Sequence, residues 1–223
     1  MASSAQRLVA FVALHERAVP RLHASGALWA ESSERRANSS LRSALWRVPS
    51  PAGVEVIEAS DTHLWLNPRV SVDFKETVAW ATSILDPAGT AEQSDDRALQ
   101  LQVLRDDLLP EWYEDWVLVE RERFRQLRLH ALEAICERFT EEGKYGLALE
   151  AGLAAVAAEP LRESAHRLVV RVHLKEGNLA EASRQYRACA RLLADALGAR
   201  PSPSMDRLFG DRSVNSRQPV LSD

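Results

Sequence analysis

A repeat in the second half of the sequence is the feature that most limits what this chain can fold into. Gly143-Lys144-Tyr145 followed by Ala148 returns 34 residues later as Gly177-Asn178-Leu179 followed by Ala182. A period of this length is typical of helix pairs that stack in a row, each pair burying its face on its neighbours. The repeat therefore predicts a helical array over this part of the chain.

Further residues of the two copies assign the array to the tetratricopeptide (TPR) type. Ala155 and Pro160 occupy later consensus positions of the first copy, and Tyr186 occupies the aromatic position of the second. Gly152 departs from the pattern, because an aromatic residue is expected there. A long helical pattern from about Trp116 to Glu142 precedes the repeat. The chain is therefore expected to be mainly α-helical.

The composition is that of an ordinary globular protein, with 46% hydrophobic and 27% charged residues among 223. The apolar run from Leu8 to Leu14 has seven residues, whereas a membrane span needs about 20 and a secretory signal needs a longer apolar stretch with a cleavage site. The two cysteines, Cys136 and Cys189, do not have the spacing of metal ligands. We therefore expect a cytoplasmic protein without a disulfide scaffold, a metal or a cofactor.

The sequence contains none of the common catalytic motifs. A phosphate loop, a dinucleotide-binding glycine motif, a nucleophile elbow and an HExxH helix are all missing. Of the six histidines only His166 and His173 share a helical face, and their spacing is more typical of packed or surface histidines than of metal ligands. The chain is therefore not expected to be an enzyme.

Positive charge gathers near the N-terminus, although the chain as a whole carries a net charge of −4. The densest part runs from Glu34 to Arg47, with four arginines and one acid. Ser32-Ser33 offers an N-cap for a helix, Glu34 favours the helix dipole, and Pro49 and Pro51 stop the helix. One basic helix on an acidic chain favours contact with a defined nucleic-acid site over a general attraction to phosphate.

The elements around this helix follow the order of a winged helix-turn-helix. Helices are expected over about Ala5–Val12 and from Pro20, as the first helical residue, to Trp29. Two β-prone runs after the basic helix, Val54–Ala59 and Thr62–Leu66, are joined at Ser60-Asp61 and predict a hairpin. In this fold the third helix enters the major groove of DNA, and the hairpin, or wing, touches the backbone or the minor groove.

The outward faces of the basic helix and of the wing supply the candidate DNA contacts. An apolar stripe from Ala37 to Val48 leaves the polar side chains of the helix on the opposite side. Arginine binds guanine or phosphate, asparagine pairs with adenine, and serine is short enough to let the backbone approach the groove. The candidates are Arg35, Arg36, Asn38, Ser39, Ser40, Arg42, Ser43 and Arg47 on the helix, and Thr62 and His63 on the wing. A solvated surface helix without a binding role is the alternative interpretation.

An acidic run from Asp106 to Glu122 has seven acids against the single Arg121. Trp112, Tyr113 and Trp116 lie within it. These aromatic side chains either form a protein-docking face or pack into a helix junction, and the sequence leaves both interpretations open.

Eight short strings of residues, spread over both halves of the chain, are informative about its family. They are Gln6–Phe11, Leu28-Trp29, Leu41–Arg47, Leu109–Val117, Glu120–Arg123, Arg128–Glu133, Glu159–His166 and Val172–Asn178. In these strings the sequence resembles the actinobacterial SARP-type transcriptional regulators, named for antibiotic regulatory proteins. Members of that family join an OmpR-like winged helix to a bacterial transcriptional activator domain.

The resemblance implies a domain division and a mechanism. Residues 1–70 would form the winged helix and residues 71–208 the TPR-like activator domain. The composition of the chain beyond Pro203 predicts a disordered tail over residues 209–223. A SARP-like protein binds direct repeats in promoter DNA, commonly as side-by-side protomers, and recruits RNA polymerase through its sigma subunit and other subunits. Family members usually begin with a small antiparallel sheet before the first helix; here the expectation is that this sheet is absent or that the sequence has a shortened start. The alternative is a TPR-like protein-interaction module whose truncated winged helix does not bind DNA.

Overall fold

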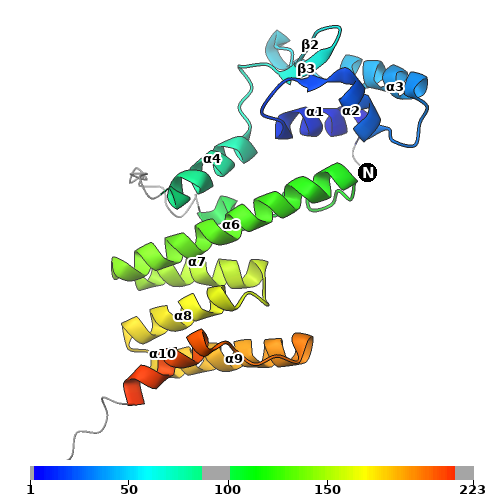
Figure 1. Cartoon of the computed structure of the whole chain (residues 1–223). Coiled ribbons are helices and arrows are strands. Elements are labelled where there is room, and N and C mark those ends of the chain that lie inside the picture. Colours follow the sequence, from blue (N-terminus) through cyan, green and yellow to red (C-terminus); the bar gives the residue numbers. More distant parts are fainter. Residues whose placement is uncertain (1–2, 87–100, 214–223) are drawn as a thin grey trace, which may run out of the picture. The chain divides into compact units, whose positions relative to one another are not determined.

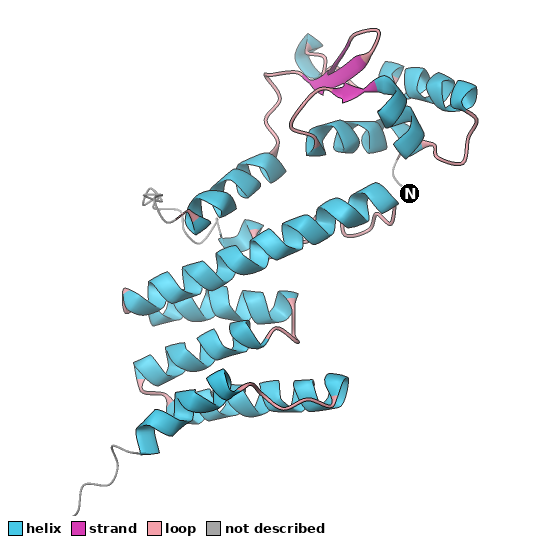
Figure 2. Cartoon of the chain, viewed as in Figure 1, coloured by secondary structure: helices cyan, strands magenta, loops and turns pink. Residues whose placement is uncertain are grey.

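The computed structural model describes residues 3–86 and 101–213, which divide into two compact units. Unit 1 comprises Met1–Ala79 and Asp107–Phe124, and unit 2 comprises Trp80–Asp106 and Arg125–Asp223. Helices dominate both units, and the strands of the described residues lie in unit 1 (Figures 1 and 2). The stretch Pro87–Asp96 is polar and rich in turn-forming residues, which predicts a mobile connection, but it lies outside the described residues.

Unit 1 has the predicted winged helix-turn-helix fold. Its elements in chain order are α1 (Ser4–Leu14), β1 (Val19–Pro20), α2 (Arg21–Leu28), α3 (Glu34–Trp46), β2 (Ile57–Ala59) and β3 (His63–Leu66). The three strands form an antiparallel sheet in the order β1-β3-β2. In the register of the sheet, Leu64 of the central strand β3 pairs with Val19 of β1 and with Ala59 of β2. The hairpin of β2 and β3, with the turn between them, is called the wing below.

The helices of unit 1 pack on one apolar cluster. Helix α1 begins with a capping box between Ser3 and Gln6. In a capping box each of the two side chains accepts a hydrogen bond from the backbone N–H of the other residue. Phe11 of α1, Leu41 of α3 and Leu64 of β3 are buried together in this cluster. Because α3 buries the stripe that contains Leu41, its basic side faces away from the cluster.

One local expectation in unit 1 is wrong, and a second is confirmed only in part. Pro20 is the last residue of β1 and precedes α2, rather than being the first residue of the helix. The reason is a pairing with β3, which is distant in sequence and draws Val19 and Pro20 into the sheet. Ser33 occupies the N-cap of α3, but its side chain makes no capping hydrogen bond; its carbonyl accepts from the Ala37 N–H at 2.9 Å.

Unit 2 contains the predicted TPR-like array. The helices are α4 (Asp73–Leu85) and α6 (Asp115–Glu141), which both have residues in each unit, then α7 (Tyr145–Ala158), α8 (Glu163–Glu176), α9 (Leu179–Leu197) and α10 (Pro203–Ser213). Gly143 and Gly177, the repeated glycines, have φ of 71° and 90° between successive helices, a backbone conformation that glycine adopts at little cost. Helix α7 packs on α8, and α8 packs on α9, as expected for neighbours in a stack.

The last helix of unit 2 extends into the region that the sequence predicts to be a tail. Residues 209–213 were expected to be disordered, but α10 continues to Ser213. Phe209 packs edge-on against Tyr186 of α9 with ring centroids 5.3 Å apart, and the Tyr186 hydroxyl donates to Asp206 at 2.7 Å. The aromatic side chain at this position of the repeat therefore holds the last helix, which local composition does not reveal. Residues 214–223 lie outside the described residues.

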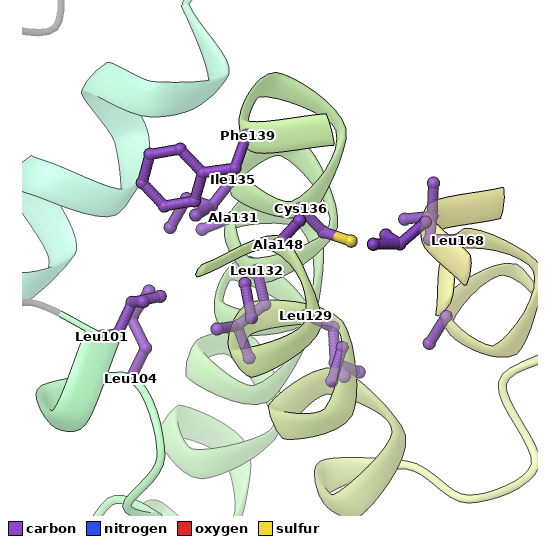
Figure 3. Packing of buried hydrophobic residues seen from close by; sticks show 14 of the residues in the cluster. Leu101, Leu104, Leu129, Ala131, Leu132, Ile135, Cys136, Phe139, Ala148 and Leu168 are labelled. Carbon is purple, nitrogen blue, oxygen red and sulfur yellow. The ribbon is translucent and has the colours of Figure 1, made fainter. Parts of the chain in front are cut away.

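The core of unit 2 lies between α6, α7 and α8 (Figure 3). Phe139 and Leu132 of α6 are buried there together with Leu104 and Ala148. The sulfur of Cys136, in the same cluster, points toward Leu168 of α8 (Figure 3), and burial raises the pKa of its thiol to about 11. The thiol is therefore protonated at neutral pH and serves the packing, because the thiolate is the reactive form of cysteine.

Polar side chains connect the helices of unit 2 at the start of α8. The Arg162 guanidinium donates two hydrogen bonds of 2.8 Å to the Glu133 carboxylate. Burial raises the pKa of Glu133, but these bonds and one from Ser164 outweigh it, so that the pKa lies below its usual value. His166 is buried and bonded to the Pro160 carbonyl and to Gln185, each at 2.9 Å. His166 therefore has a structural role in this unit.

Gly152 shows why this chain departs from the TPR pattern. A Cβ at this position of α7 would lie 2.8 Å from Cγ2 of Val169 and 3.1 Å from Sγ of Cys136. Three helices therefore approach one another at a point where only glycine fits.

We expect Gly152→Ala to lower the free energy of unfolding by up to about 2 kcal/mol, because an overpacking cost of about 1–3 kcal/mol exceeds the gain of about 1 kcal/mol in helix propensity. Gly146→Ala in the same helix is the matched control, since a Cβ there meets nothing within 4 Å, and it should raise stability slightly. Urea unfolding measures both variants. Equal stability of the two variants would contradict the close approach at Gly152.

Candidate nucleic-acid interface

Helix α3 presents four arginines to solvent. Ala37, Leu41 and Ala44 are buried on one side, so the helical repeat turns the basic positions outward. The arginines Arg35, Arg36, Arg42 and Arg47 are exposed, and within residues 3–86 and 101–213 their guanidinium groups have no hydrogen bond or ion pair. By contrast, Arg7 of α1 is bound to Glu114 at 2.8 Å. The face of α3 is therefore free to meet an external anion.

The wing ends in a turn that its own hydrogen bonds hold in shape. The Ser60 hydroxyl accepts from the backbone N–H groups of Thr62 and His63 at 3.3 and 3.0 Å. Across the strands, the Trp65 indole donates to Glu58 at 2.8 Å. Thr62 is exposed and His63 is half-buried at the tip. The predicted wing donors thus lie on an ordered turn.

A groove of about 680 Å³ separates α3 from the wing tip. It is lined by Pro20, Arg21, Leu22, Arg35, Asn38, Leu41, Arg42, Asp61, Thr62 and His63. Five of the ten candidate residues from the sequence therefore meet in one hollow, three of them from α3 and two from the wing. Three arginines against Asp61 give the groove a positive balance, which suits a phosphate backbone.

The other five candidates do not line the groove. They are Arg36, Ser39, Ser40, Ser43 and Arg47. At 100° per residue, Arg36, Ser40 and Arg47 lie on the flank of α3 turned away from the groove, whereas Ser39 and Ser43 lie on its crest, the outermost line of the helix. Ser40 is half-buried and the remaining four are exposed.

Two residues near the candidate face were not among the candidates named from the sequence. Arg21, at the start of α2, donates its backbone N–H to the Thr62 carbonyl at 2.8 Å and its guanidinium to the Ser60 carbonyl at 3.1 Å. No local signal places Arg21 beside the wing, because only the pairing of β1 with β3 brings them together. Trp46, the last residue of α3, is 88% exposed.

The acidic run follows the packing interpretation at its two tryptophans. Trp116 packs edge-on against Phe11 with ring centroids 5.2 Å apart, and Trp112 packs against Trp116 at 6.1 Å. Packing within unit 1 therefore accounts for the two tryptophans. Tyr113 is 79% exposed and remains available to solvent.

The fold and this face define a class of protein: a winged helix-turn-helix followed by a TPR-like helical domain. A family model described as "bacterial transcriptional activator domain" matches residues 72–211. The chain belongs to this family and is a SARP-type transcriptional regulator. The family is one of transcription regulators rather than of enzymes.

The chain is similar to two named proteins, one by sequence and one by fold. The chain is 32% identical over 104 residues to regulatory protein AfsR of Streptomyces coelicolor, an alignment that covers 47% of this chain and 10% of AfsR. It also resembles the structure of Mycobacterium tuberculosis EmbR in complex with a low-affinity phosphopeptide, with a TM-score of 0.62 and 20% identity over 99% of this chain and 61% of EmbR. At that identity the second match shows the fold. The chain thus spans about a tenth of AfsR and less than two thirds of EmbR.

Hydropathy gives one further result. Within the described ranges, no helix combines the length and the apolar character that crossing a bilayer requires.

Proposed function

We propose that this chain is a sequence-specific DNA-binding transcriptional activator that recruits RNA polymerase. The observation that carries the proposal is the groove, in which arginines of α3 and donors of the wing tip converge. In a winged helix the recognition helix lies in the major groove while the wing reaches the adjacent backbone. A phosphodiester strand between those two elements would pass through this groove.

The wider assignment follows the family. Residues 1–70 would act as the DNA-binding domain, residues 71–208 as the activator domain, and protomers would bind promoter direct repeats side by side. The activator domain would supply contacts between protomers and with RNA polymerase, including its sigma subunit. Such a regulator acts where the promoter is, in the cytoplasm.

A salt titration of binding to a promoter duplex tests the proposal. The logarithm of the binding constant should fall linearly with the logarithm of salt concentration, with a slope of about −0.9 per phosphate contact. Arg42→Ala and Arg47→Ala should each weaken binding about tenfold while the circular dichroism of the helices stays unchanged. A uniform loss over all sequences identifies a phosphate contact, and a changed tolerance at one base position identifies a base contact.

Two results would count against the proposal. Equal binding by a variant and the wild type would remove that arginine from the interface. Failure of the wild type to bind any duplex at low salt would leave the TPR-like protein-interaction module as the function of the chain.

A further inference from the structure

Trp46 is the one tryptophan of this chain that stands in solvent. It is 88% exposed, whereas the other five tryptophans are all half-buried. In the part of the chain that the structure describes, its indole has no hydrogen bond and no ring partner. Removing an apolar side chain of this size from water is strongly favourable, so its exposure suggests a surface that covers it in a complex.

The position of Trp46 restricts what that surface is. Trp46 follows Arg42 by four residues and Ser43 by three, which places it on the crest of α3. Its neighbours along the crest, Ser39 and Ser43, are short, so the indole projects beyond them. A partner that receives this crest must have an apolar patch in a recess and negative charge around it, to match Arg42 and Arg47.

The major groove of DNA has this combination of features. Phosphates line its rim, and the 5-methyl group of thymine is the apolar group that base pairs present there. From this charge complementarity we infer that the Trp46 indole packs against a thymine methyl group in the major groove and contributes to the choice of site. The inference rests on the proposed function and adds a base-reading residue to it.

The experiment uses the full chain with duplexes selected from a random-sequence library. Trp46→Ala should bind a selected duplex about tenfold more weakly than the wild type. Its salt slope should be unchanged, because no phosphate contact is lost, whereas Arg42→Ala should have a shallower slope. Trp46→Phe, which retains an aromatic ring, should bind with intermediate affinity.

Replacing single thymines by deoxyuridine removes the methyl group without changing the protein. At the contacted position this replacement should weaken wild-type binding about fourfold. It should not change the affinity of the Trp46→Ala variant. Equal binding by the wild type and Trp46→Ala would overturn the inference. So would a deoxyuridine effect of the same size in both proteins, or no effect at any position. If the wild type selects no duplex at all, the proposed function itself fails.

Discussion

The double variant Arg35→Ala/Arg42→Ala should lose about 100-fold in affinity for promoter DNA. Arg35 and Arg42 line the same flank of α3 and face the wing across the groove. Each arginine contact to a base or a phosphate is worth about one factor of ten. If both contact phosphates, the slope of the salt titration should become shallower by about 2 as well. Fluorescence anisotropy with a labelled duplex measures both quantities.

A matched control distinguishes the effect of the groove on DNA affinity from the effect of net charge. The double variant Arg17→Ala/Arg69→Ala also removes two positive charges, but from exposed positions of unit 1 that do not line the groove. This control should change affinity by no more than about twofold, because neither side chain lines the groove and salt screens exposed charges that make no direct contact. Similar losses in the two double variants would show that overall charge, rather than the groove, governs binding.

Phe139→Ala should lower the free energy of unfolding by about 3–5 kcal/mol. Phe139 is 1% exposed and lies in the core of unit 2 with Leu132 and Ile135 (Figure 3). Truncation loses the transfer free energy of the ring and leaves a cavity that the packed helices fill only in part. Because domains are stable by about 5–15 kcal/mol, the loss should also reduce activation of transcription in the cell.

Leu153→Ala provides the comparison for Phe139→Ala. Leu153 lies on α7 but is 48% exposed, so its truncation should cost less than about 1 kcal/mol. The urea midpoint should shift strongly for Phe139→Ala with little change in the slope of the transition. A shift as small as that of Leu153→Ala would mean that the core of unit 2 tolerates the loss of the ring.

The sequence predicts the elements of this protein well wherever a local pattern decides them. The apolar stripe of α3, the hairpin at Ser60-Asp61 and the 34-residue repeat all match the structure. These patterns work because helical and strand periodicity directly express which side of an element is buried. The errors at Pro20 and at residues 209–213 arise where partners distant in sequence, β3 and Tyr186, determine the local structure.

For the candidate site, too, local patterns in the sequence predict some features and only the tertiary structure determines the others. Residue types and spacing alone are sufficient to name α3 and the wing, and to place Arg35, Arg42 and Trp46 on the outward side of the helix. Only the tertiary structure decides which flank of α3 faces the wing, because burial of Leu41 and Ala44 fixes the rotation of the helix. It also brings Arg21 to Thr62 through the pairing of β1 with β3. Such contacts between distant residues depend on how the elements pack, and no local pattern in the sequence records them.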